Sequence, residues 1–102
     1  MLAHSVFFSL HDQAPAAREA LVADCRKYLA NHPGVQFFAA GLLADEFVRP
    51  VNDRQFDVAL HVVFRDKAAH DAYQQSPEHL EFIDRNKPHW KAVRVFDAYV
   101  ES

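Results

Sequence analysis

A tyrosine and a histidine lie six residues apart around a helix start in the segment from Tyr73 to Phe82. Ser76 followed by Pro77 is typical of an N-cap and a first helical position, so His79 falls at the third position, where a capping box would have Glu or Gln. The partial positive charge of a helix N-terminus disfavours imidazolium, and we expect a neutral His79 at pH 7. A neutral imidazole can remove a proton while a phenol donates to a carbonyl or enolate oxygen. The pair therefore predicts acid–base chemistry, with His79 as base and Tyr73 as acid.

His4 is the third candidate, because it lies on the first apolar segment and can orient a polar substrate group or fix the tautomer of His79. Each of the three residues also has a purely structural interpretation. A histidine can be a core residue whose polar atoms bond the backbone, and a tyrosine can be a core aromatic with a solvated hydroxyl. The residue pattern leaves both interpretations open.

Alternating apolar segments and amphipathic segments follow one another in the order β-α-β-β-α-β, the pattern of the ferredoxin-like α+β fold. The expected strands are 2–10, 35–44, 56–64 and 93–100. The expected helices are one capped by Asp12 that stops near Asn31, a short one capped by Asp66, and one that begins at Ser76 and ends near Pro88. Residues 45–55 are expected to form a loop. From this length we expect a single domain, 1–102.

In this topology strands 2–10 and 56–64 are expected to be parallel neighbours at the centre of an otherwise antiparallel four-stranded sheet. The helices should cover the more apolar sheet face, so that His4 points toward them. A pocket between sheet and helices would be lined by apolar residues that an aromatic-rich core explains equally well: Phe8, Val58, Leu60, Phe82 and Trp90.

The opposite sheet face carries too many large apolar groups for a surface exposed to water. Ser5, Phe7, Asp57 and His61 fall on this face. A second copy of the chain is the usual cover for such a face, and we expect a homodimer through it.

Composition excludes several classes of partner. The net charge is −3 and basic residues are scattered singly, which argues against a nucleic-acid or anionic-membrane partner. No apolar run reaches the ~20 residues of a membrane span, and the default location is cytoplasmic. The single cysteine, Cys25, is expected to be a buried thiol.

No metal or cofactor motif occurs in the sequence. Cysteine and histidine clusters with zinc spacing are absent, and with only two glycines the chain has no glycine-rich phosphate loop. We therefore expect no cofactor and no dedicated metal site, although two or three histidines in one pocket can bind a metal adventitiously. His11, His32, His70 and His89 are expected to be solvated.

Three stretches, "HSVFFSL", "FDVALHVVF" and "AYQQSPEHLEF", resemble the stress-responsive dimeric α/β-barrel (Dabb) domain. The resemblance implies a homodimer whose two sheets face each other, with a pocket between sheet and helices in each subunit. Most members have no assigned activity. Some plant members are cofactor-independent polyketide cyclases that use the turn histidine and its tyrosine, and related dimeric barrels include monooxygenases and heme-handling enzymes.

Carried over residue by residue, the resemblance matches His4, Tyr73 and His79. The cyclase-like members carry a further polar residue on the third strand, where this chain has Val58 and Leu60, and this departure disfavours cyclase chemistry. The favoured hypothesis is a stress-associated binding domain for a small aromatic or polyketide-like ligand. The alternative is a cofactor-independent cyclase or lyase, or a monooxygenase-like enzyme.

Overall fold

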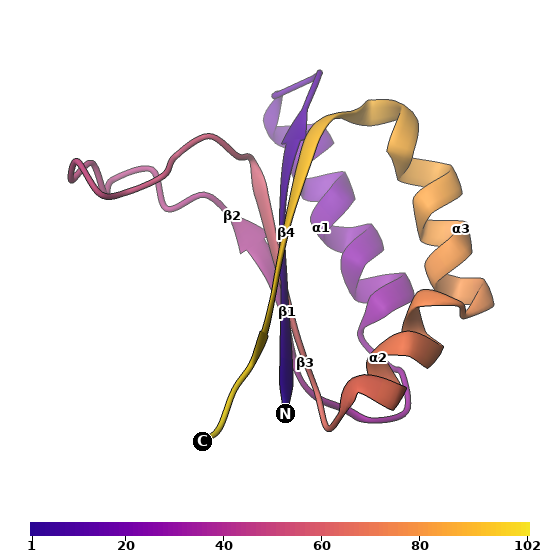
Figure 1. The fold of residues 1–102 in the computed structure, drawn as a ribbon. Helices are drawn as coiled ribbons and strands as arrows, with labels where there is room; N and C mark the ends of the chain where they lie inside the picture. The colour runs from indigo at the N-terminus through magenta and orange to yellow at the C-terminus, as the bar shows by residue number, and fades with distance from the viewer.

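A computed structural model describes residues 1–102, which form one sheet with helices on one face (Figure 1). The order along the chain is β1 α1 β2 β3 α2 α3 β4, which confirms the ferredoxin-like pattern. The elements are β1 (Leu2–Leu10), α1 (Pro15–Leu29), β2 (Val35–Leu42), β3 (Val58–Phe64), α2 (Lys67–Gln74), α3 (Pro77–Asn86), a 3₁₀ turn (Lys87–His89) and β4 (Trp90–Tyr99). None of the helices has the length and hydropathy needed to cross a membrane.

The sheet has the strand order β2-β3-β1-β4, so β1 and β3 are central neighbours as expected. Their expected parallel orientation is wrong, because Leu2 pairs with Phe64 and Phe8 with Val58 in an antiparallel register. The helix α1 returns the chain so that β2 runs in the direction of β1, and β3 then runs antiparallel to β2. Every neighbouring pair in the sheet is antiparallel.

The helix starts follow local capping chemistry. The Asp66 carboxylate accepts a hydrogen bond from the backbone N–H of Ala69 at 2.9 Å, and the Ser76 hydroxyl accepts one from the N–H of His79 at 3.1 Å. Asp12 does not cap α1 as expected. The helix begins two residues later because Pro15 occupies its first position. The Asp12 carboxylate instead accepts a hydrogen bond from the backbone N–H of Ala14, just before the helix.

The core lies between the sheet and the helices. Residues of β1 and β3 alternate between buried and half-buried, and the buried set includes Val6, Phe8, Leu60 and Val62, as the period of two predicts. Cys25 is fully buried, and burial raises the pKa of its thiol to about 12. The thiol is therefore a packing group, as expected.

Asp57 differs from its predicted place on the open sheet face. It precedes β3, is 7% exposed, and its carboxylate accepts a hydrogen bond from the buried N–H of Leu10 at 2.8 Å. Its own N–H donates to the carbonyl of Phe8 at 2.8 Å. Asp57 fixes the end of β1 to the start of β3, and it contributes little exposed surface to that face.

Candidate functional site

A cavity of about 160 Å³ lies between the sheet and the helices α2 and α3. It is mostly apolar, and its lining residues come from β1, β3, β4 and all three helices. They are His4, Val6, Phe8, Leu29, Leu60, Tyr73, Gln74, His79, Phe82, Ile83, Trp90, Val93 and Val95. The cavity is least covered along the edge strand β4, where Val93 is 38% exposed and Val95 50% exposed.

The structure brings the three candidate residues His4, Tyr73 and His79 to this one cavity. Four of the five expected apolar lining residues are also present. Val58 is the exception, because it is fully buried in the core next to Phe8 and does not reach the cavity.

Tyr73 lies at the centre of an aromatic cluster on α2. Its ring centroid is 4.9 Å from that of Phe64, 4.8 Å from His79 and 5.0 Å from His32. The residue is 2% exposed, and its buried hydroxyl has no hydrogen-bond partner in the protein. Burial raises the pKa of Tyr73 well above its ordinary range, so the phenol stays protonated and is available to donate a hydrogen bond to a bound molecule.

His79 is held by the Ser76 cap at the start of α3 and is 8% exposed. Its Nδ1 atom is buried without a hydrogen-bond partner. Burial lowers the pKa of His79 to about 4, and positive charge on His4, His32 and His70 acts in the same direction. The backbone carbonyl of Gln74 partly offsets this by raising the pKa of His79. The neutral state agrees with the sequence prediction, but desolvation is its main cause, rather than the helix N-terminus.

His4 faces the helices as predicted, and its polar partner is Asp97 on the neighbouring strand. The distance from His4 Nδ1 to Asp97 Oδ1 is 2.5 Å. The His4 ring also packs edge-on against His70 and Tyr73, at centroid distances of 5.2 and 6.1 Å. His4 is therefore fixed by Asp97, and it does not set the tautomer of His79 through a direct hydrogen bond.

The prediction of four solvated histidines is wrong for His32 and His70, which are both half-buried beside the site. One ring nitrogen of His32 lies 2.8 Å from the carbonyl of Tyr28, and its ring packs on Tyr73. His70 is three residues before Tyr73 on the same helix, a spacing that places both on one helix face. This three-residue spacing from Tyr73 is the feature of the sequence that could have placed His70 beside the site. His11 and His89 are exposed, as expected.

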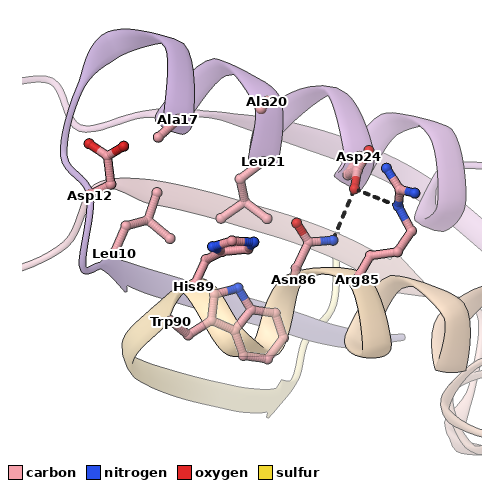
Figure 2. A pocket seen from close by; sticks show the side chains of 10 residues that line it. All are labelled: Leu10, Asp12, Ala17, Ala20, Leu21, Asp24, Arg85, Asn86, His89 and Trp90. Carbon is pink, nitrogen blue, oxygen red and sulfur yellow. Dashed lines mark hydrogen bonds and ion pairs between the residues drawn. The ribbon is translucent and has the colours of Figure 1, made fainter.

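A second cavity of about 330 Å³ lies between α1 and the end of α3 (Figure 2). On one side of it Asp24 accepts hydrogen bonds from Arg85 at 3.2 Å and from Asn86 at 3.0 Å. Trp90 lines both cavities, and its buried indole Nε1 has no partner. Asp24, Arg85 and Asn86 are thus paired with one another, and none of the three candidate catalytic residues lines this second cavity.

Besides Trp90, which both cavities share, two residues that line the cavity beside Tyr73 carry a buried polar atom without a partner: the Tyr73 hydroxyl and Nδ1 of His79. An unsatisfied buried polar group costs about 1–3 kcal/mol. A neutral imidazole carries one proton, so Nδ1 accepts a hydrogen bond or a proton when Nε2 carries the hydrogen. A bound molecule with one polar group can satisfy both atoms.

The low pKa of His79 predicts a specific pH dependence of stability. Its folded pKa of about 4 is below the unfolded value of about 6.5, so the stabilisation is present above pH 6.5 and is lost as the pH falls through 4. We expect His79 to account for a loss of about 2–3 kcal/mol in unfolding free energy between pH 7 and pH 4. Urea unfolding of the parent and of His79→Gln measures this difference. Equal pH slopes, or an NMR titration of His79 with a midpoint near 6.5, would refute the assignment.

Solved structures share this fold. A Dabb family protein with a ferredoxin-like fold from Mesorhizobium loti has a TM-score of 0.78 and 24% identity, covering 99% of this chain and 97% of that one. A dimeric ferredoxin-like protein of unknown function from Thermobifida fusca has a TM-score of 0.78 and 18% identity, covering 97% and 90%. A hydroxynitrile lyase from Passiflora edulis has a TM-score of 0.77 and 21% identity, covering 98% and 93%.

No curated protein sequence matches the chain. The sequence does match the family profile described as the stress responsive A/B barrel domain, over residues 2–100. This match spans every strand and helix and includes His4, Tyr73 and His79. The chain therefore belongs to the Dabb, or stress responsive A/B barrel domain, family.

Proposed function

We propose that the protein binds a small, mostly apolar molecule that carries one oxygen-containing polar group, in the cavity beside Tyr73. The observation that carries the proposal is the pair of buried atoms without partners, the Tyr73 hydroxyl and Nδ1 of His79. Four polar residues line this cavity: His4, Tyr73, Gln74 and His79. The other lining side chains are aliphatic or aromatic, as in most small-molecule sites.

The volume of the cavity limits the size of the ligand. A cavity of roughly 150 Å³ in a protein core accommodates benzene, so about 160 Å³ suits a single aromatic ring with a small substituent. A longer, polyketide-like molecule would have to extend past Val93 and Val95 at the β4 edge, where both side chains are partly exposed. We therefore favour a single-ring aromatic ligand.

The two polar atoms define the chemistry of the substituent. The protonated Tyr73 hydroxyl donates a hydrogen bond, which fits a carbonyl or hydroxyl oxygen. The neutral imidazole of His79 accepts from a hydroxyl or donates to an oxygen, depending on its tautomer. An aromatic aldehyde or alcohol satisfies these requirements.

Benzaldehyde and toluene form a matched pair of probes, because they are similar in size and only the aldehyde has an oxygen. We expect the parent to bind benzaldehyde more tightly than toluene, and Tyr73→Phe to weaken benzaldehyde binding about tenfold, the worth of one hydrogen bond. Toluene binding should not change. Titrations followed by NMR chemical shifts measure both affinities.

Tyr28→Phe is the control for this experiment, since Tyr28 is half-buried on α1 and does not line the cavity. It should bind both probes like the parent. Benzaldehyde binding that is unchanged in Tyr73→Phe, or weakened equally in Tyr28→Phe, would contradict the proposed role of the Tyr73 hydroxyl.

A second candidate function is a cofactor-free lyase, because a neutral imidazole and a protonated phenol share one mostly apolar cavity. A hydroxynitrile lyase has the same fold. On an aromatic hydroxynitrile, His79 would take the hydroxyl proton, the bond between the carbinol carbon and the nitrile carbon would break, and cyanide would leave and recover the proton. Tyr73 would donate a hydrogen bond to the oxygen that becomes the aldehyde.

Mandelonitrile tests the lyase, because its cleavage releases benzaldehyde, which absorbs in the ultraviolet. We expect release above the buffer rate and a loss of about 10²–10⁴-fold in kcat for His79→Gln, the range of general base catalysis. His11→Gln, at an exposed position, should keep the parent rate. A parent protein that binds benzaldehyde yet leaves mandelonitrile uncleaved would contradict the lyase and retain the binding function.

We also propose that two copies pair through the open sheet face. Ser5, Phe7 and His61 lie on this face with Phe96, which is 55% exposed and pairs with Ser5 across β1 and β4. The Phe7 and Phe96 rings are in edge contact at 5.8 Å, and Ser5 Oγ lies 3.0 Å from His61 Nδ1. The protein from Thermobifida fusca with this fold is described as dimeric.

The loop between β2 and β3, residues 43–57, supports this proposal. It projects from the sheet on the side opposite the helices (Figure 1). It carries three exposed apolar side chains, Phe47, Val48 and Val51, with exposures of 54, 67 and 85%. A second copy on the open face would lie beside this loop and could cover them.

Light scattering at micromolar concentration tests the dimer. We expect a mass of twice 11.7 kDa for the parent and a monomer for Phe96→Arg, because a charge replaces an apolar contact. Leu80→Arg is the matched control, since Leu80 is 52% exposed on α3, on the helix side. A monomeric parent, or dissociation by Leu80→Arg alone, would overturn the proposed interface.

A further inference from the structure

Three metal-ligating side chains meet on the helix-covered face of the sheet: His4 from β1, Asp97 from β4 and His70 from α2. Each offers one ligand atom, and the three atoms lie within 4.8 Å of one another. The antiparallel register pairs His4 with Asp97, so both side chains leave the sheet on the same face. We propose that this cluster is a binding site for a divalent transition metal of the zinc class.

The distances fit a site that closes around an ion. In tetrahedral zinc sites with bonds of about 2.0–2.1 Å, neighbouring ligand atoms are about 3.3 Å apart. His4 Nδ1 and Asp97 Oδ1 are closer than this, at 2.5 Å, because they are hydrogen-bonded directly to each other. An ion would replace that hydrogen bond and separate the two atoms slightly, while His70 would move inward.

The environment of His70 resembles the outer shell of known histidine metal sites. Its Nδ1 lies 3.0 Å from Asp71 Oδ1, and the other Asp71 oxygen accepts from Lys67 at 2.5 Å. A carboxylate that accepts from one ring nitrogen orients a metal-binding histidine and raises the basicity of the other nitrogen. When Nδ1 donates to Asp71, the lone pair on Nε2 of His70 is available to the metal.

The cluster is shielded on one side and accessible on the other. His4 is 5% exposed, whereas the side chains of His70 and Asp97 are 18% and 44% exposed. Two imidazoles and one carboxylate suit Zn²⁺, Co²⁺ or Ni²⁺ better than Mg²⁺ or Ca²⁺, which prefer oxygen ligands. Three protein ligands leave a fourth position for water, as in zinc sites that bind a substrate.

Metal binding is separable from ligand binding in the aromatic cavity. His4 belongs to both the cluster and the cavity lining, but His70 and Asp97 do not line the cavity, and Tyr73 and His79 are not part of the cluster. Variants at His70 and Asp97 therefore test the metal site without removing either polar atom that the ligand proposal needs.

The test uses the full chain after removal of metals with EDTA. Co²⁺ is titrated and followed by its visible absorption, which is strong only for tetrahedral or five-coordinate sites, and Zn²⁺ is titrated by calorimetry. We expect one ion per chain. His70→Gln and Asp97→Asn should each weaken binding at least tenfold, and Asp71→Asn about tenfold, as for other outer-shell partners.

His11→Gln is the control, because it removes an exposed histidine outside the cluster. It should bind like the parent. Absence of Co²⁺ and Zn²⁺ binding to the parent would overturn the site. Binding that His70→Gln and Asp97→Asn leave unchanged would also overturn it, since the ion would then be held by other side chains. Circular dichroism of each variant shows that a loss of binding does not arise from unfolding.

Discussion

The central constraint in this structure is the burial of two neighbouring polar atoms, on Tyr73 and His79, that the protein itself does not satisfy. The Tyr73 hydroxyl and Nδ1 of His79 are removed from water by the packing of α2 and α3 on the sheet. Each costs free energy when left unpaired. The same burial keeps the phenol protonated and the imidazole neutral, so one physical cause sets both the affinity for a polar group and the protonation states that a reaction would need.

The junction between α2 and α3 is the element that holds the two groups together. Ser76 bonds the carbonyl of Tyr73 at 2.9 Å and accepts from the N–H of His79 at 3.1 Å, so one side chain joins the end of one helix to the start of the next. Pro77 fixes the first turn of α3. The ring centroids of Tyr73 and His79 are therefore held 4.8 Å apart.

His4 connects the cavity to the edge of the sheet. It lines the cavity on one side and is bonded to Asp97 on the other, next to His70. An ion held by His4, His70 and Asp97 would lie next to the ligand cavity. Neither Tyr73 nor His79 would be among its ligands. The proposed metal site and the ligand cavity are therefore neighbours that share one residue, His4.

The order of elements, the buried sheet face and the Ser76 cap could be predicted from the sequence, because they depend on local periodicity and capping. Strand orientation could not be predicted from periodicity. The parallel orientation predicted for β1 and β3 is wrong, because the two strands are antiparallel. The involvement of Asp97 depends on the register of β1 and β4, which are far apart in the chain. The positions of His32 and His70 likewise depend on how the helices pack. A prediction made from each histidine's place in the sequence therefore assigned both to solvent.

The most direct test is a crystal structure of the protein grown with benzaldehyde. The account predicts that the ring occupies the cavity between Leu60 and Phe82, with the aldehyde oxygen within hydrogen-bond distance of the Tyr73 hydroxyl. An empty cavity at saturating benzaldehyde, or a ligand whose oxygen points away from both Tyr73 and His79, would contradict it.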